Sequence, residues 1–328
     1  MYAIEIRNLV KRFGDLKAVD DISFSIKKGE IFGLLGPNGA GKTTTINLML
    51  NLLEPTSGKV LIDGLDVTRH YEEIKQRIGL MTQETVVEPD LTARQNLWLF
   101  AKLYHVPNSE IPSRVEDALK AADLVEFGDE QAGMFSGGMK RRLQLVKTMI
   151  HRPQILILDE PTTGLDVQSR VDMWRRIEDL NKRGVTIVLT TQYLEEADEL
   201  CNRIAIIDHG KIKDMGTPSE LKRNAFSGRI LEIIVDKSDT ERTAAIVKDK
   251  LGIKPEVKGE RIYATVEGAD TASLKKIATA IESKGIKIIS IGLHLPTLDD
   301  VFIKLTGSSI RDALGEQQSS RSMAMLRR

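Results

Sequence analysis

An apolar stretch that leads into a glycine-rich loop and then a helix-forming segment constrains the fold of this chain most. Ile31–Leu35 is strand-like, and GPNGAGKT at Gly36–Thr43 fits the pattern GxxxxGK(S/T) without a mismatch. Glycines let backbone N–H groups curl around a phosphate, and the following helix N-terminus adds the positive end of its dipole. The sequence therefore predicts a strand, a phosphate-binding loop and a helix in succession.

The residues of this loop are candidate nucleotide ligands. We assign to the phosphate site Gly36, Pro37, Asn38, Gly39, Ala40, Gly41, Lys42, Thr43 and Thr44. Lys42 is expected to reach the β- and γ-phosphate oxygens, and the Thr43 hydroxyl to bind Mg²⁺. The simpler alternative is a glycine-rich turn, which the flanking strand and helix disfavour. A dinucleotide fingerprint is excluded because Gly39-Ala40-Gly41 lacks the third glycine.

Two carboxylates follow a second apolar stretch. Ile155–Leu158 is continuously apolar and precedes Asp159 and Glu160, so both acids are expected at the carboxyl edge of a buried strand. Asp159 suits Mg²⁺ through water, and Glu160 is placed to polarise an attacking water as a general base. The alternative is a loop with two solvated acids, which the buried strand disfavours.

The order of strand-like and helical segments predicts the fold class. Residues 1–225 alternate between the two, which indicates an α/β fold with a largely parallel sheet, and residues from about 85 to 150 are helical in pattern. Residues 229–306 carry short, closely spaced elements and predict a small α+β domain. Its expected helices are 240–251, 271–283 and 297–305, and its expected strands are 230–235, 262–266 and 286–291. Residues 307–328 show little periodicity and are expected to be a disordered tail.

Charge and cysteine content exclude several classes of protein. Lys and Arg number 47, as do Asp and Glu, so no net charge attracts nucleic acid, and no nucleic-acid partner is expected. Cys201 is the only cysteine, which rules out an internal disulfide and favours a reducing compartment. The apolar runs are too short to span a bilayer. The histidines lack metal-like spacing, so each is expected to be a surface or packing residue.

A third motif identifies the family that this sequence resembles. FSGGMKRR at Phe135–Arg142 resembles the signature of ATP-binding-cassette (ABC) ATPases and lies upstream of ILILDE, as in that family. The resemblance covers residues 1–220 and implies a P-loop NTPase of the ABC type with a helical signature subdomain. It also implies ATP and Mg²⁺ as ligands. Two copies would pack head to tail, so that each signature completes the ATP site of the other copy.

The resemblance implies further site residues. Phe13 would stack on adenine, although a place in the core is the alternative for this side chain. Gln83 would meet Mg²⁺ together with Thr43 and Asp159, and Asp166 would lie in the loop that crosses the dimer interface. The signature residues expected to act on the partner's ATP are Ser136, Gly137, Gly138 and Met139.

The signature also has a chemistry of its own. Ser136 suits a helix N-cap, and Gly137-Gly138 leaves N–H groups free for an anion. Lys140–Arg142 places positive charge at the unfavourable end of the helix dipole. Two interpretations of Arg141 and Arg142 stay open: an incoming polyphosphate offsets their charge, or surface acids pair with them.

Gln192 follows the strand-like residues 186–189, where most ABC ATPases carry histidine. An amide can donate a hydrogen bond but cannot shuttle a proton. Gln192 is therefore expected to act in catalysis by sensing the γ-phosphate, while proton removal falls to Glu160. The alternative is that Gln192 only caps a loop.

Gln192, Met139 and the segment PTLDDVFIKLTG at Pro296–Gly307 together resemble the ATPase subunits of daunorubicin-resistance-type drug exporters. The resemblance implies an ATPase at the cytoplasmic face of the membrane that powers efflux of drugs or other amphipathic compounds through a separate permease. ATPases for export of sodium, polysaccharide or lipid remain alternatives. An importer ATPase is disfavoured by the C-terminal segment, and a non-transport ABC ATPase by the single cassette.

Overall fold

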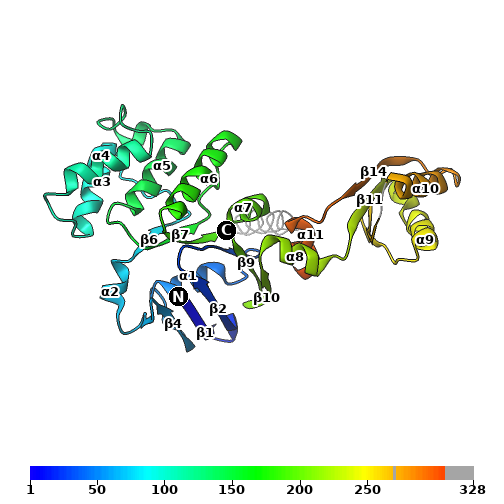
Figure 1. Cartoon of the computed structure of the whole chain (residues 1–328), viewed down its shortest axis with the longest axis horizontal. Helices are drawn as coiled ribbons and strands as arrows, with labels where there is room; N and C mark the ends of the chain where they lie inside the picture. Colours follow the sequence, from blue (N-terminus) through cyan, green and yellow to red (C-terminus); the bar gives the residue numbers. More distant parts are fainter. Residues whose placement is uncertain (269–270, 307–328) are drawn as a thin grey trace, which may run out of the picture. The chain divides into compact units, whose positions relative to one another are not determined.

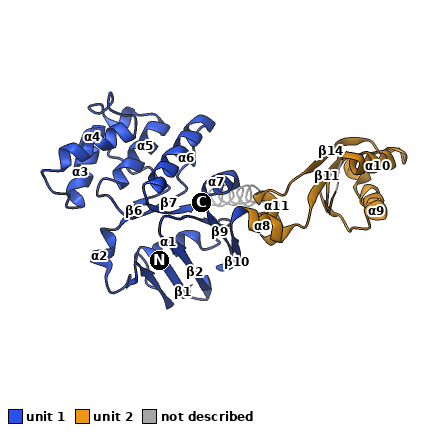
Figure 2. Cartoon of the chain, viewed as in Figure 1, with its two compact units in different colours: residues 1–218, 310–328 blue, residues 219–309 orange. Residues whose placement is uncertain are grey.

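The computed structural model describes residues 1–268 and 271–306, and these form two compact units (Figure 2). Unit 1 is Met1–Pro218, and unit 2 comprises the described residues from Ser219 onward. Helix α8 (Pro218–Ala225) therefore groups with unit 2 and not, as expected, with the first domain. The reason is local, because Lys304 donates to the carbonyl of Ala225 and lies over the ring of Phe226, 4.7 Å from its centroid.

The main sheet of unit 1 has the strand order β10-β9-β3-β8-β7-β6. Its strands are β3 (Ile31–Leu35), β6 (Ile78–Met81), β7 (Ile155–Asp159), β8 (Thr186–Thr190), β9 (Arg203–Asp208) and β10 (Lys211–Gly216). All neighbours pair in parallel except β10, which runs antiparallel to β9. Every residue of β3 and β8 is buried, as continuous apolar strands covered on both faces require. The predicted α/β fold with a largely parallel sheet is confirmed.

A second, antiparallel sheet in unit 1 was not foreseen from the sequence. Its order is β2-β1-β4-β5, with β1 (Tyr2–Phe13), β2 (Leu16–Lys27), β4 (Ser57–Ile62) and β5 (Leu65–Asp66). Phe24 of this sheet stacks on Phe32 of the main sheet with ring centroids 5.2 Å apart, so the two sheets share one apolar core. Helices α1 (Lys42–Met49) and α2 (Tyr71–Lys75) connect the two sheets along the chain (Figure 1).

Helices α3 (Ala93–Leu103), α4 (Ile111–Ala121) and α5 (Gly137–Thr148) enclose an apolar core of their own. Leu97, Leu119 and Leu143 from the three helices are fully buried in it. Helix α6 (Val167–Lys182) follows β7, and α7 (Leu194–Leu200) follows β8. No helix in the described parts of the chain is long and apolar enough to cross a membrane.

Unit 2 contains a four-stranded antiparallel sheet of order β12-β13-β11-β14, a split βαβ arrangement. Its elements are β11 (Arg229–Val235), α9 (Thr240–Leu251), β12 (Glu256–Lys258), β13 (Arg261–Val266), α10 (Thr271–Glu282), β14 (Ile288–His294) and α11 (Leu298–Thr306). Strand β12 was not predicted from the sequence, because its three residues are all exposed and form no apolar pattern. The expected tail, 307–328, lies outside the described residues.

The core of the helical segment gives a stability prediction. Leu119→Ala removes a fully buried side chain and should lower the free energy of unfolding of unit 1 by about 2–5 kcal/mol. Leu103→Ala, at a position 62% exposed, is the matched control and should cost less than about 0.5 kcal/mol. Urea unfolding measures both, and equal losses would contradict the assignment of this core.

Candidate active site

A polar cavity of about 480 Å³ lies at the carboxyl edge of the main sheet. Because β3, β6, β7 and β8 are parallel, the loops that follow them meet at this edge. The cavity is lined by Leu16, Lys17, Ala18, Asn38, Gly39, Gly41, Lys42, Thr43, Thr44, Gln83, Asp159, Glu160, Gln192 and His209. Residues from six separate segments of the sequence are thus brought together.

The loop after β3 requires glycine at defined positions. A Cβ on Gly36 would lie 2.2 Å from the carbonyl oxygen of Ile207. A Cβ on Gly41 would lie 2.3 Å from the carbonyl oxygen of Ala18, and Gly41 has a φ of 105°. Neither position accepts a side chain without moving backbone, so the glycines allow the close approach that shapes the loop.

Lys42 begins helix α1 and is buried. Its ammonium donates to the carbonyl oxygens of Gly36 at 2.7 Å and Pro37 at 3.1 Å, so it lies across the loop that it follows. Burial lowers the pKa of Lys42, while the negative charges of Glu160 and Asp159 oppose this shift. A buried cation beside two carboxylates and the end of a helix is suited to hold a polyphosphate and a metal ion together.

The two carboxylates at the end of β7 have different partners. Asp159 accepts a hydrogen bond from the hydroxyl of Thr190 at the end of β8. Glu160 Oε2 accepts from Gln83 Nε2 at 3.2 Å and from Thr163 Oγ1 at 3.0 Å. The Glu160 backbone is left-handed, with a φ of 49°, which turns the chain sharply at the edge of the sheet.

Gln192 reaches the same carboxylate through one intermediate. Its Nε2 donates to Thr163 Oγ1 at 3.4 Å, and that hydroxyl donates in turn to Glu160. Sequence analysis did not assign Thr163. The indication available in the sequence was that Thr163 carries a hydroxyl three residues after Glu160, the proposed catalytic acid.

The oxygen donors fit Mg²⁺. Thr43, Gln83 and Asp159 line one cavity and offer hydroxyl, amide and carboxylate oxygens, the donor types that this ion prefers. Mg²⁺ commonly binds through one or two protein carboxylates plus waters and substrate phosphates. The described residues contain no cluster of three or more His, Cys, Asp or Glu side chains that could hold a metal ion.

Sequence analysis missed part of the cavity lining. Leu16, Lys17 and Ala18 come from the start of β2, and His209 from the turn after β9. No motif marks these positions, because only the pairing of strands distant in sequence brings them to the loop. Phe13, predicted to stack on adenine, is 47% exposed at the end of β1 and lies outside the described cavity lining, as do Gly36, Pro37 and Ala40.

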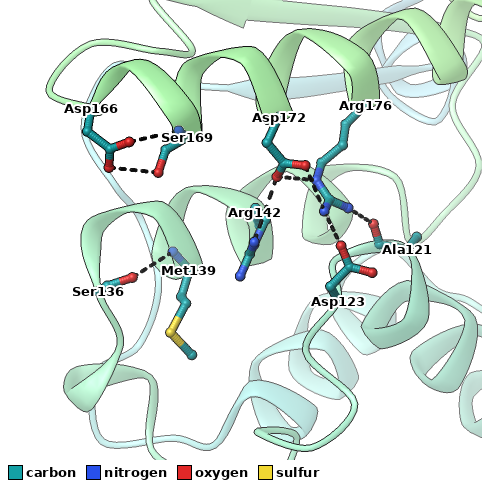
Figure 3. Close-up of polar contacts among 9 residues, drawn as sticks. All are labelled: Ala121, Asp123, Ser136, Met139, Arg142, Asp166, Ser169, Asp172 and Arg176. Carbon is teal, nitrogen blue, oxygen red and sulfur yellow. Dashed lines mark hydrogen bonds and ion pairs between the residues drawn. The ribbon is translucent and has the colours of Figure 1, made fainter.

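Ser136 and Met139 lie at the start of α5, and Asp166 lies at the start of α6 (Figure 3). The two helix starts are neighbours, since a Cβ on Gly138 would lie 3.0 Å from Ser169 Oγ. Ser136 caps α5, since its Oγ accepts from the Met139 amide at 3.2 Å. Asp166 caps α6 by accepting from the Ser169 amide at 2.8 Å. Ser136–Met139 and Asp166 contribute nothing to the described lining of the cavity in their own chain.

The basic residues after the signature differ from one another. Arg142 has an ion pair with Asp172 at 3.7 Å, and Asp172 also binds Arg176, which bonds to Ala121 and Asp123 (Figure 3). Pairing of Arg142 with an acid is therefore confirmed. For Arg141 both open interpretations were wrong, because its side chain is buried and its hydrogen-bond acceptors are chiefly backbone carbonyls.

The comparisons with known proteins agree with this geometry. The family model described as ABC transporter matches residues 19–163, and that of the ATP-binding protein DrrA1-3-like C-terminal domain matches residues 216–306. A dimeric post-hydrolysis structure of the ATP-binding cassette MJ0796, bound to ADP and Pi, is similar with a TM-score of 0.59 and 26% identity. This similarity covers 65% of the present chain and 98% of that one.

Two relatives cover almost the whole chain. The daunorubicin resistance ATP-binding protein DrrA2 of Streptomyces coeruleorubidus is 40% identical over 93% of this chain and 95% of its own length. The linearmycin resistance ATP-binding protein LnrL of Bacillus subtilis is 36% identical over 94% of this chain and 100% of its own length. The chain belongs to the ATP-binding proteins of ABC transporters, in the group that contains the daunorubicin resistance ATP-binding proteins.

Proposed function

We propose that this chain hydrolyses ATP to power export through a separate membrane permease. The observation that carries the hydrolytic part is the single cavity in which the phosphate loop, Gln83, Asp159, Glu160 and Gln192 meet. It combines a phosphate-binding loop with a carboxylate for water activation, the parts that phosphoryl transfer to water needs.

Each residue has a role in this proposal. Lys42 and the amides of the phosphate loop bind the β- and γ-phosphates. Glu160 orients and deprotonates the attacking water, and Gln83 and Thr163 fix its carboxylate. Gln192 donates its amide N–H to the γ-phosphate. Thr43, Gln83 and Asp159 would hold Mg²⁺, which supplies charge neutralisation at the phosphates when bound. Phe13 stacks on the adenine.

A homodimer is part of the proposal. Ser136, Gly137, Gly138 and Met139 lie outside the described cavity lining, and Ser136 and Gly137 are exposed. The amides of a helix start without acidic residues suit the phosphates of an ATP held by a second copy. Asp166 would lie in the same interface. The MJ0796 cassette, similar in structure, is dimeric.

The transport partner is inferred from the relatives. DrrA2 and LnrL are named for resistance to daunorubicin and linearmycin, and both align along nearly the whole of this chain, including unit 2. We infer that this chain acts at the cytoplasmic face of the membrane, bound to a permease that carries the drug-like or other amphipathic cargo.

The assignment of Glu160 predicts a trapped state. Glu160→Gln should lower ATP turnover by about 10²- to 10⁴-fold, because the amide cannot take a proton, while ATP binding persists. ATP-dependent dimers should then accumulate in size-exclusion chromatography. Lys42→Ala with Glu160→Gln is the control and should form none. Near-normal hydrolysis by Glu160→Gln would contradict the assignment of Glu160 as the general base.

Gln192 gives a second prediction. Gln192→Ala should lower turnover by about 10- to 100-fold, because it removes a hydrogen bond to a charged group. Gln192→His should retain much of the activity because histidine can donate the same bond. Gln154→Ala, at an exposed position, should have no effect. Full activity of Gln192→Ala in a phosphate-release assay would reduce Gln192 to a loop residue.

The coupling to transport is tested on the complex. A tagged full-length chain, expressed in its native host, should copurify from detergent-solubilised membranes with a multi-span hydrophobic protein. In vesicles, amphipathic drugs such as daunorubicin should stimulate ATP hydrolysis by the complex, and the Glu160→Gln complex should not respond. An active chain with no membrane partner and no drug response would leave the ATPase assignment intact and exclude the export role.

A further inference from the structure

The Arg141 side chain makes five hydrogen bonds, although it does not line the cavity and none of its described acceptors is a carboxylate oxygen. It lies on α5, five residues after the Ser136 cap, and is 2% exposed. Its donors reach two segments that carry proposed catalytic residues. The bonds go to Glu160 O at 2.6 Å, Pro161 O at 2.8 Å, Gln83 O at 2.9 Å, Thr82 O at 3.1 Å and Gln144 Oε1 at 2.9 Å.

The contact to Glu160 bears on a strained backbone. A left-handed φ is unfavourable for a residue other than glycine, so the turn must be held by its surroundings. Thr190 holds its amide end, since Glu160 N donates to Thr190 O at 3.0 Å. Arg141 holds the carbonyl end and the following carbonyl of Pro161. Thr190 and Arg141 thus hold the two ends of the backbone from which the Glu160 carboxylate projects.

The contacts to Thr82 and Gln83 act on the second partner of that carboxylate. Gln83 donates to Glu160 Oε2, and its own carbonyl is held by Arg141. Gln144, which also binds Arg141, donates to Thr82 O at 3.2 Å and Glu84 O at 2.9 Å. One side chain of α5 thus fixes both the acid and the amide that orients it.

Only an arginine can make this set of bonds. A guanidinium presents five N–H donors in a planar fork, whereas a lysine ammonium donates from a single atom. Burial lowers the pKa of Arg141, and the charges of Asp159, Glu160 and Glu196 oppose that shift. The backbone carbonyls of Thr82, Gln83, Glu160 and Pro161 are the main hydrogen-bond partners of this buried charge.

We propose that Arg141 is a positioning residue that couples the signature helix to the hydrolytic acid of the same chain. The inference rests on the proposed role of Glu160. In the proposed dimer the start of α5 meets the ATP of the partner, whereas Arg141 holds Glu160 beside this chain's own ATP. Movement of α5 on engagement of the partner's nucleotide is then transmitted to the geometry of the local acid.

The experiment compares Arg141→Lys and Arg141→Met with a matched control, Arg114→Lys, in the full chain. Arg114 is a partly buried arginine of the helical segment that, like Arg141, donates to a backbone carbonyl, Ile150 O at 2.9 Å, and it does not line the cavity. Turnover at saturating ATP should fall roughly 10- to 100-fold for both Arg141 variants, since displacement of a catalytic group by about 1 Å has this effect. The Kd for ATP should change less than about threefold, because the phosphate loop is untouched.

A double-mutant cycle separates positioning from general loss of structure. In the Glu160→Gln background, Arg141→Lys should lower the residual turnover less than about twofold, because the group that it positions is absent. Arg114→Lys should leave turnover within about twofold of the parent in both backgrounds.

Wild-type turnover of Arg141→Lys overturns the inference, as does an equal fold-loss in the two backgrounds or a parallel loss of ATP affinity. If Arg141→Met does not fold, the Arg141→Lys cycle decides alone. Normal turnover of Glu160→Gln itself would instead refute the proposed role of the acid, so the two failures are distinguishable.

Discussion

The parallel pairing of β3, β6, β7 and β8 is the constraint on which the rest of the site depends. Parallel strands place all their carboxyl ends at one edge, so the loops after them must converge there. The backbone hydrogen bonds of these buried strands are satisfied within the sheet, which makes it a rigid support. The phosphate loop, the two carboxylates, Gln83 and Gln192 are each no more than a few residues from a strand end. Their positions follow from the sheet.

A network of hydrogen bonds then refines these positions. Gln192, Thr163, Glu160 and Gln83 form a connected series around one carboxylate, and Arg141 holds the backbone beneath it. Such networks are sensitive to the loss of any member, because a buried polar group without a partner is costly. The amide at position 192 fits this arrangement, since it can donate to a hydroxyl or a phosphate without changing charge.

The helical segment relates to the site differently. Helices α3, α4 and α5 have a separate apolar core, and Arg141, Gln144 and Lys147 of α5 also make polar contacts with the loops after β6 and β7. The helical segment therefore has an apolar interior of its own and is joined to the loops that carry Gln83 and Glu160 by buried hydrogen bonds.

The sequence by itself determined the elements that are specified by residues close to one another along the chain. The phosphate loop, the strand that carries Asp159 and Glu160, the helical pattern between residues 93 and 148 and most elements of unit 2 follow from periodicity, glycine spacing and strand-end polarity. The family followed from the joint order of the motifs. The antiparallel sheet of β1, β2, β4 and β5 and the exposed strand β12 escaped prediction, because pairing between distant segments and not local pattern defines them.

Only the tertiary structure decided what Arg141 and Thr163 do. In the sequence Arg141 is one of three consecutive cations at a helix start, with nothing to distinguish it from Arg142. In the structure one helical step turns Arg141 inward to the backbone of Glu160 and leaves Arg142 at the loose ion pair with Asp172. Hydrogen bonds to backbone carbonyls have no signature in the sequence, because every residue offers the same acceptor. The sequence therefore determines the residue types, while the tertiary structure determines which groups they contact.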